Sequence, residues 1–212
     1  MIKTREVILL TGKTGSGKSL LLKKTLLDKS RIIIFDTISE YRDLTPPYSA
    51  LFISDLHELI DYLMENGDKA FRIIFDPEDP DELISLNNGQ ELTVFDFTCK
   101  FIYESLTNVT LAIEEIANYM TLPHRRDYLR KIVRFGRHSA ISLYATTQRP
   151  ADISPVIRAQ ITKFISFRQH EPRDIEWIRQ VIGDEAFKLK DLDAFVWGKP
   201  MLQDKHYKEY IL

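Results

Sequence analysis

The chain has 212 residues, of which 44% are hydrophobic and 28% charged, and these proportions are ordinary for a globular protein with a large core. A net charge of −2 excludes a protein that coats polyanions with its whole surface, so any nucleic-acid contact must be local. No apolar run approaches the roughly 18 residues that span a bilayer, and the single cysteine, Cys99, excludes an internal disulfide. The N-terminus also lacks a signal-peptide layout. We expect one domain over residues 1–212 without a membrane segment, in the cytoplasm or, for a viral protein, in the host cytoplasm.

A glycine-rich motif follows the first strand-like run, Glu6–Thr11, and precedes a helical pattern that continues to about Lys29. The motif, GKTGSGKS at Gly12–Ser19, has the spacing G-x-x-x-x-G-K-[ST] and the strand–loop–helix context of a P-loop. Glycine permits close approach of the backbone to a phosphate, and the N–H groups at the start of the helix point inward. The residues predicted to hold the nucleotide are Gly12, Lys13, Thr14, Gly15, Ser16, Gly17, Lys18, Ser19 and Leu20.

Two side chains of this motif have predicted chemical roles. Lys18 would reach the β- and γ-phosphates, and the Ser19 hydroxyl would ligate Mg²⁺. The motif therefore predicts a nucleotide phosphate held with Mg²⁺, but by itself it does not separate kinases, GTPases and motors.

Strand-like and helix-like patterns alternate through the rest of the chain, which is typical of an α/β fold with a largely parallel β-sheet flanked by helices. The further expected strands are Arg31–Asp36, Ala50–Ile53, Phe71–Phe75, Val109–Ile113, Ala140–Thr146 and Lys163–Phe167. The expected helices are Asp55–Asn66, one capped by Asp79 with Pro80 at its first position, Glu91–Leu106, Arg125–Phe135, Ser154–Ala159 and Pro172–Val181. Residues 193–212 are expected to form a C-terminal β-hairpin or edge strands.

A second acidic motif, TLAIEE, ends one of these apolar strands with Glu114 and Glu115. Ligands of open α/β sheets bind outside the carboxyl ends of the strands, so both carboxylates are expected beside the P-loop. Glu114 takes the position normally held by the Walker B aspartate and is a predicted Mg²⁺ ligand. Glu115 would be the base that polarises the attacking water. The longer side chain at position 114 shifts the carboxylate, and the two glutamates could divide these roles differently.

The run GRHSAISLYATTQRPADISPVIRAQITKFISFRQHEPRDIEWI, residues 136–178, contains a strand ending ATTQRP and a strand ending SFR. In these features above all, it is similar to the C-terminal half of the motor domain of FtsK/HerA-type DNA-pumping ATPases. IFDTISEY, residues 34–41, resembles the second strand of the family, which ends in an Asp followed by a Glu-Tyr pair. The resemblance covers about Val7–Ile182. It implies a RecA-like sheet in which another strand separates the P-loop strand from the Glu114 strand.

The resemblance also implies roles for single residues. Gln148 matches the family's sensor glutamine, which would read the γ-phosphate or the water, and Arg137 is similar to an arginine that serves the nucleotide of the neighbouring subunit in these rings. Such an arginine can accelerate hydrolysis by several powers of ten. The resemblance therefore implies a homo-oligomeric ring, which we expect to be a hexamer. The candidates for the trans role are Arg137, Arg158 and Arg173.

One segment, His124–His138, is strongly basic and carries a single acid, Asp127. Such a segment could line a ring channel and grip DNA phosphates without reading sequence. A solvated helix face or an intersubunit salt-bridge surface is the alternative interpretation. The candidate DNA-binding residues are Arg125, Arg126, Arg130 and Arg134.

These features predict an ATPase that translocates or packages double-stranded DNA as a ring-shaped motor, with ATP and Mg²⁺ as cofactors. The alternative is a P-loop ATPase that powers phage or protein assembly or secretion. A small-molecule kinase is a weaker alternative, because a water-activating glutamate such as Glu115 would waste ATP. A GTPase is weaker still, because the chain contains no NKxD base-reading motif.

Overall fold

The computed structural model of the protein describes residues 5–44, 49–120, 127–195 and 203–212. The strands are β1 (Val7–Thr11), β2 (Arg31–Phe35), β3 (Leu51–Ile53), β4 (Phe71–Phe75), β5 (Leu83–Ser85), β6 (Glu91–Thr93), β7 (Thr110–Ile113), β8 (Ser142–Thr147), β9 (Lys163–Phe167) and β10 (Tyr207–Ile211). The α-helices are α1 (Lys18–Leu26), α2 (Leu56–Asn66), α3 (Val94–Ser105), α4 (Asp127–Phe135), α5 (Pro155–Arg158) and α6 (Pro172–Ile182). Short 3₁₀ helices are η1 (Arg42–Leu44), η2 (Ile116–Tyr119), η3 (Pro150–Asp152) and η4 (Gly183–Asp191).

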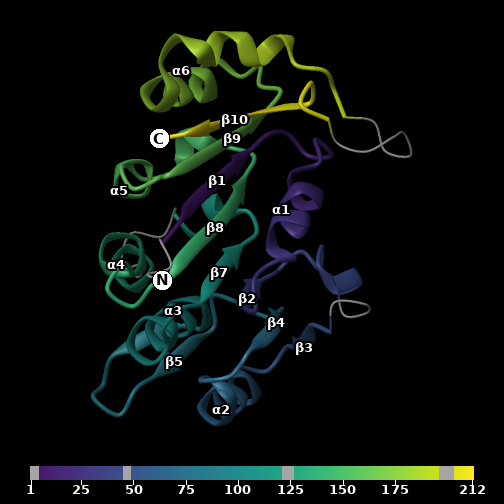
Figure 1. The fold of residues 1–212 in the computed structure, drawn as a ribbon. Coiled ribbons are helices and arrows are strands. Elements are labelled where there is room, and N and C mark those ends of the chain that lie inside the picture. The colour runs from purple at the N-terminus through teal and green to yellow at the C-terminus, as the bar shows by residue number, and fades with distance from the viewer. Residues whose placement is uncertain (1–4, 45–48, 121–126, 196–202) are drawn as a thin grey trace.

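The main sheet has eight strands in the order β10-β9-β1-β8-β7-β2-β4-β3 (Figure 1). All neighbours run parallel except β10, which pairs antiparallel with β9 at one edge. The predicted α/β fold with a largely parallel sheet is therefore confirmed, and β10 is the expected C-terminal edge strand. As expected, one strand, β8, separates the P-loop strand β1 from the Glu114 strand β7.

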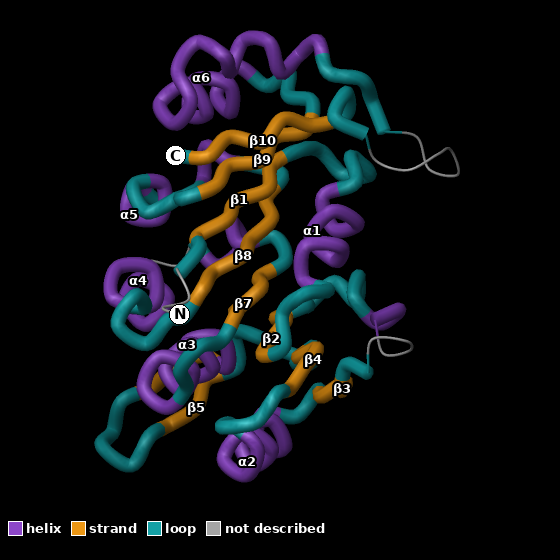
Figure 2. The backbone as a smooth tube through the Cα atoms, in the orientation of Figure 1, coloured by secondary structure: helices purple, strands orange, loops and turns teal. Residues whose placement is uncertain are grey.

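Helices cover both faces of this sheet, so its central strands are buried on both sides (Figure 2). All five residues of β1 are buried, which explains why the strand is a continuous apolar run instead of an alternating one. One face packs against α2, α3, α4, α5 and α6. The other packs against α1 and the segment through Tyr41 and Leu44. The P-loop helix therefore covers the sheet almost alone on its side.

Local sequence signals explain where several helices begin and end. Asp55 accepts a 2.8 Å hydrogen bond from the backbone N–H of Glu58 and so caps α2, and the spacing of Asp55 and Glu58 is that of a capping box. Thr93 caps α3, and the three residues before that helix form β6, so the helix predicted from Glu91 begins at Val94. Gly183 ends α6 with a φ of 68°.

The helix predicted after Asp79 and Pro80 is wrong. The chain instead forms the two-stranded hairpin β5–β6, with Leu83 opposite Thr93. The Asp79 carboxylate accepts a 2.9 Å hydrogen bond from the N–H of Asp81, which makes a turn where a helix was expected. The Asn88-Gly89 pair lies in the hairpin turn, a position that such pairs favour.

Within the part of the chain that the structure describes, none of the helices has both the length and the apolar character needed to cross a bilayer.

Candidate active site

The P-loop lies at the carboxyl edge of the sheet, where the parallel strands end. Gly15 and Gly17 have φ angles of 73° and 96°, in the left-handed region that glycine adopts without strain, and Gly17 caps α1. The backbone N–H groups of Gly17, Lys18 and Ser19 have no hydrogen-bond acceptor among the described residues. Unpaired N–H groups at the positive end of a helix form an anion site. The backbone is therefore arranged as phosphate binding requires.

Gly12 is needed for close packing. A Cβ there would lie 2.7 Å from the Phe167 Cβ and 2.7 Å from the Ser16 Oγ, and β9 therefore leaves no space for a side chain at the start of the loop. The Gly12 N–H donates to the Thr147 carbonyl at 3.2 Å, which continues the pairing of β1 with β8 into the motif. The loop is thus fixed to two neighbouring strands.

Lys18 is buried, with 6% of its surface exposed, and its Nζ donates to the Lys13 carbonyl at 3.1 Å. Burial lowers the pKa of Lys18, and the negative charges of Glu114, Glu115 and Glu40 oppose that shift. A cation enclosed by the loop and facing carboxylates is a suitable partner for phosphate oxygens. The position agrees with its predicted role.

Ser19 and Glu114 lie together, as a shared metal requires. The Ser19 hydroxyl donates to Glu114 Oε1 at 3.2 Å, across 95 residues of sequence. The second oxygen, Oε2, accepts from the Tyr41 hydroxyl at 2.5 Å. Burial raises the pKa of Glu114, while the hydrogen bonds from Tyr41, Thr146 and Ser19 and the charge of Lys18 lower it. Hydroxyl and carboxylate oxygens are the donors that Mg²⁺ prefers, so this pair fits that ion.

Glu115 is held by the end of β8. Both of its carboxylate oxygens lie 3.0 Å from the backbone nitrogen of Gln148, and Oε1 also accepts from the Thr147 hydroxyl at 3.0 Å. The Glu115 backbone has a φ of 49°, which is uncommon for a residue with a side chain, and its N–H donates to the Thr146 hydroxyl. The carboxylate therefore lies between the Glu114 strand and the predicted sensor strand.

Gln148 links this carboxylate to the P-loop. Its Oε1 accepts a 2.7 Å hydrogen bond from the Thr14 hydroxyl, so its side chain reaches back to the loop while its backbone holds Glu115. Thr14 of the P-loop, the predicted sensor Gln148 and the predicted base Glu115 are thus connected by hydrogen bonds.

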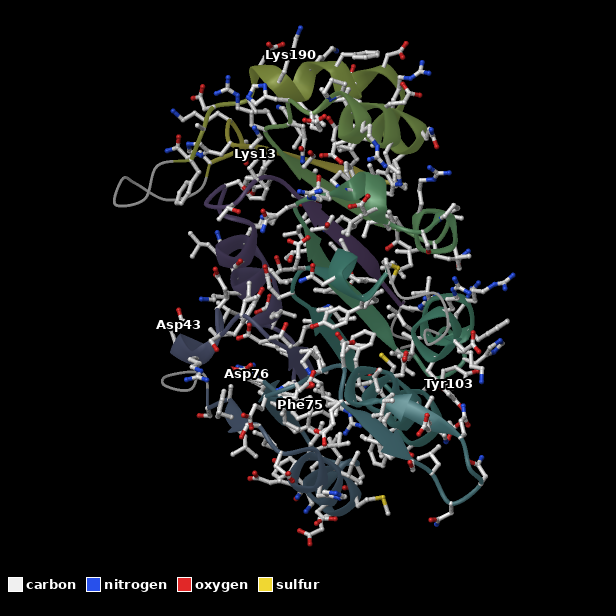
Figure 3. The ribbon with its side chains drawn as sticks, turned by 180° about the vertical axis from the view of Figure 1, so that it is seen from behind. Lys13, Asp43, Phe75, Asp76, Tyr103 and Lys190 are labelled. Atoms are coloured by element: carbon white, nitrogen blue, oxygen red, sulfur yellow. The ribbon has the colours of Figure 1, made fainter. Side chains whose placement is uncertain are left out.

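Strand register explains why residues so far apart in sequence meet. Parallel pairing places Thr11 opposite Thr147, and Ile113 opposite both Phe35 and Ala145. The residues that follow these strands consequently emerge at one edge. Figure 3 shows Lys13, Asp43 and Asp76 along one side of the molecule and Tyr103 on the other.

The sequence reasoning missed the part played by the Asp36–Tyr41 segment. Asp36 is fully buried, and its carboxylate accepts hydrogen bonds from the N–H groups of Glu40 and Tyr41 at 3.1 and 2.8 Å. Burial raises the pKa of Asp36, and these two N–H groups oppose the shift. The sequence does carry a signal, since the Asp and the Glu-Tyr pair of IFDTISEY are the residues of the family resemblance, but no sequence pattern assigns a contact to them.

No protein-family model matches the sequence, and no curated protein matches it either. Solved structures do match. The genome packaging NTPase B204 from Sulfolobus turreted icosahedral virus 2 in complex with AMP aligns with a TM-score of 0.68 at 21% identity, over 98% of this chain and 92% of that one. The protein has the fold of B204.

Two further structures have the same fold. B204, described as the DNA-packaging ATPase from Sulfolobus turreted icosahedral virus, matches with a TM-score of 0.63 at 19% identity, over 89% of this chain and 88% of that one. VirB4 of Thermoanaerobacter pseudethanolicus matches with a TM-score of 0.63 at 14% identity, over 89% and 85% of the two chains. At these identities the likeness shows a shared fold, whereas the roles of the site residues depend on this chain's own contacts.

The three candidate trans arginines lie at different places on this B204-like fold. Arg137 is exposed in the turn between α4 and β8, at the edge of the sheet where the parallel strands begin. The P-loop lies at the opposite edge, and the six residues of β8 separate the two edges by about 20 Å. Arg158 lies at the end of α5, where its guanidinium donates to Gln180 and lies over the Trp177 ring. Arg173 lines a cavity of about 350 Å³ that Lys13 also lines, so it lies beside its own P-loop.

The basic segment is described in part. Arg130 and Arg134 are exposed on α4, whose buried face of Leu129, Ile132 and Val133 packs into the core. The other two DNA-binding candidates, Arg125 and Arg126, lie outside the described residues, and the helix predicted from Arg125 is described from Asp127.

Proposed function

We propose that this chain is a Mg²⁺-dependent ATPase that moves double-stranded DNA as a homo-oligomeric ring. The observation that carries the ATPase part is the hydrogen-bonded group at one sheet edge: Ser19 bound to Glu114, and Glu115 bound to the end of β8 beside the P-loop. Phosphoryl transfer needs positioning and charge stabilisation more than covalent chemistry, and these residues supply both.

In this proposal each residue has a definite task. The unpaired N–H groups of the P-loop and the Lys18 ammonium bind the phosphates of ATP. Ser19 and Glu114 hold Mg²⁺, which neutralises charge on the β- and γ-phosphate oxygens when it is bound. Glu115 polarises the water that attacks the γ-phosphorus, and Gln148 orients that water or the γ-phosphate.

The ring part of the proposal is supported by the position of Arg137. An exposed arginine at the amino edge, about 20 Å from the P-loop of its own chain, is not able to reach its own nucleotide. It is free to complete the site of a neighbouring copy. We therefore assign the trans role to Arg137 and place Arg173, beside its own P-loop, in the same chain's site.

The DNA part of the proposal is supported by α4. The helix presents Arg130 and Arg134 to solvent, and its start follows Glu115 by twelve residues along the chain. A change at Glu115 on hydrolysis would therefore move a basic surface, which grips phosphates without reading sequence. B204, whose fold this chain shares, is described as a DNA-packaging ATPase.

The proposal is tested by measuring ATP hydrolysis with and without double-stranded DNA, with Glu115→Gln as the matched inactive variant. We expect DNA to stimulate hydrolysis and the variant to bind ATP but hydrolyse it at least about 100-fold more slowly. A rate of ATP hydrolysis that is the same with and without double-stranded DNA would favour an ATPase that acts on protein. Transfer of phosphate to a small acceptor in place of water would reject both motors and favour a kinase.

A further inference from the structure

Tyr41 is a buried residue whose hydroxyl faces the proposed metal ligands. None of its surface is exposed, and it belongs to the same buried cluster as Leu22 of α1 and Ile34 of β2. Its hydroxyl donates to Glu114 Oε2 at 2.5 Å, while the Ser19 hydroxyl donates to Oε1 at 3.2 Å. Each oxygen of the carboxylate therefore has its own donor, and the two donors come from different elements.

The turn after β2 fixes where this hydroxyl lies. The buried Asp36 carboxylate accepts the N–H groups of Glu40 and Tyr41, which bends the chain back toward the sheet. The neighbouring strand is aligned at the same point, because the Glu114 N–H donates to the Phe35 carbonyl at 3.2 Å. Tyr41 and Glu114 thus meet because hydrogen bonds of the backbone fix both the turn and the alignment of the two strands.

We infer that Tyr41 is the positioning residue for Glu114: its hydroxyl holds Oε2 so that Oε1 stays beside Ser19, the two groups that would hold Mg²⁺. A glutamate has one more rotatable side-chain bond than the aspartate normally found at this position, so a single contact would leave its carboxylate free to turn. A second donor removes that freedom, and hydrogen bonds to a buried carboxylate are among the stronger ones. The inference rests on the proposed function, because it takes Ser19 and Glu114 as the metal ligands.

The test is the Mg²⁺ dependence of nucleotide binding, which requires no turnover. The full chain is titrated with Mg²⁺ in the presence of a fluorescent, non-hydrolysable ATP analogue, and the half-saturating Mg²⁺ concentration is compared between wild type and Tyr41→Phe. We expect that concentration to rise about tenfold in the variant. The affinity for the analogue without Mg²⁺ should not change, because the P-loop N–H groups and Lys18 do not contact the phenol.

Tyr144→Phe is the matched control. Tyr144 is also a buried tyrosine, with 1% of its surface exposed, and its hydroxyl also donates to a carboxylate, that of Glu6. Glu6 lies before β1, at the opposite edge of the sheet from the P-loop. The control removes the same kind of contact from the same core and should leave the Mg²⁺ dependence as it is.

Glu114→Asp gives a second, independent variant. A carboxylate shorter by one methylene cannot keep both hydroxyl contacts, so it should raise the half-saturating Mg²⁺ concentration on its own. Adding Tyr41→Phe to it should then cost much less than Tyr41→Phe costs in wild type, because the contact is already lost. A purely structural effect of Tyr41 would add to that of Glu114→Asp.

The outcomes separate the inference from the proposed function. If the affinity of the wild-type chain for the analogue does not depend on the Mg²⁺ concentration, both the proposed function and the inference are overturned. Normal Mg²⁺ dependence in wild type with no shift in Tyr41→Phe would overturn the inference alone. If Tyr41→Phe does not fold, the Glu114→Asp titration decides, and an unshifted curve there counts against the role of Tyr41.

Discussion

The Thr14 hydroxyl lies 2.7 Å from Gln148 Oε1 and donates a hydrogen bond to it, although 134 residues separate the two in sequence. The backbone of Gln148 holds Glu115 at the same time. The P-loop, the predicted sensor and the predicted base therefore form one connected group. A phosphate in the loop beside Thr14 would therefore lie close to the Gln148 side chain.

Gln148→Ala is expected to lower kcat for ATP hydrolysis by about 100-fold, which is the usual effect of removing one positioned polar group from a reacting centre. The KM for ATP should change much less, because the loop N–H groups and Lys18 remain. Steady-state kinetics measures both. Gln160→Ala is the control, since Gln160 lies between α5 and β9, away from the loop, and an equal loss of kcat there would refute a specific role for Gln148.

Gly12→Ala is expected to destabilise the protein by about 1–3 kcal/mol, the range for forcing extra volume into a packed site. The new Cβ would lie 2.7 Å from the Phe167 Cβ and from the Ser16 Oγ, so the loop must move and nucleotide binding should weaken as well. Thermal unfolding and nucleotide titration measure the two effects.

Gly89→Ala is the companion control for that change. A Cβ at Gly89 meets nothing within 4 Å, but its φ of 78° should still cost about 1 kcal/mol. Nucleotide affinity should be untouched, because Gly89 lies in the β5–β6 turn. If the nucleotide affinity is unchanged in both variants, the close packing of Gly12 is not needed for the P-loop to bind nucleotide.

Lys18→Ala and Arg137→Ala are each expected to abolish hydrolysis, the first through its own site and the second through the neighbour's site. Mixing the two variants should restore part of the activity, because the intact P-loop of one chain can meet the intact arginine of the other. The hydrolysis rate of the mixture, formed by dissociation and reassembly, tests this. No recovery in a mixed assembly would contradict a trans role for Arg137.

Arg130→Ala combined with Arg134→Ala is expected to reduce DNA stimulation while sparing basal hydrolysis. If each arginine neutralises one phosphate, the slope of log K against log salt for DNA binding should fall by about two. A salt titration of DNA affinity measures the slope. Lys188→Ala with Lys190→Ala removes two exposed cations from the 183–191 helix instead, and an equal change there would mean that α4 contributes only net charge.

Local patterns in the sequence were sufficient for most of the elements and for the prediction of a phosphate site. Glycine spacing, a preceding apolar strand and a following helix predict the P-loop, because its conformation is set by adjacent residues. The Asp55 cap is predicted for the same reason. After the Asp79-Pro80 pair the local signal predicted a helix, whereas the chain forms the β5–β6 hairpin.

Only the tertiary structure decided which side chains contact one another. The register of parallel strands brings Glu114 to both Ser19 and Tyr41, which are 95 and 73 residues away in sequence, and no spacing rule encodes such a contact. The length of the strands likewise separates Arg173, beside its own P-loop, from Arg137 at the amino edge of the sheet. The sequence by itself predicted a phosphate site at Gly12–Ser19, because the conformation of that loop is set by neighbouring residues. The placement of the Glu114 and Glu115 carboxylates beside that loop depends on the order of the strands, which is a property of the whole sheet.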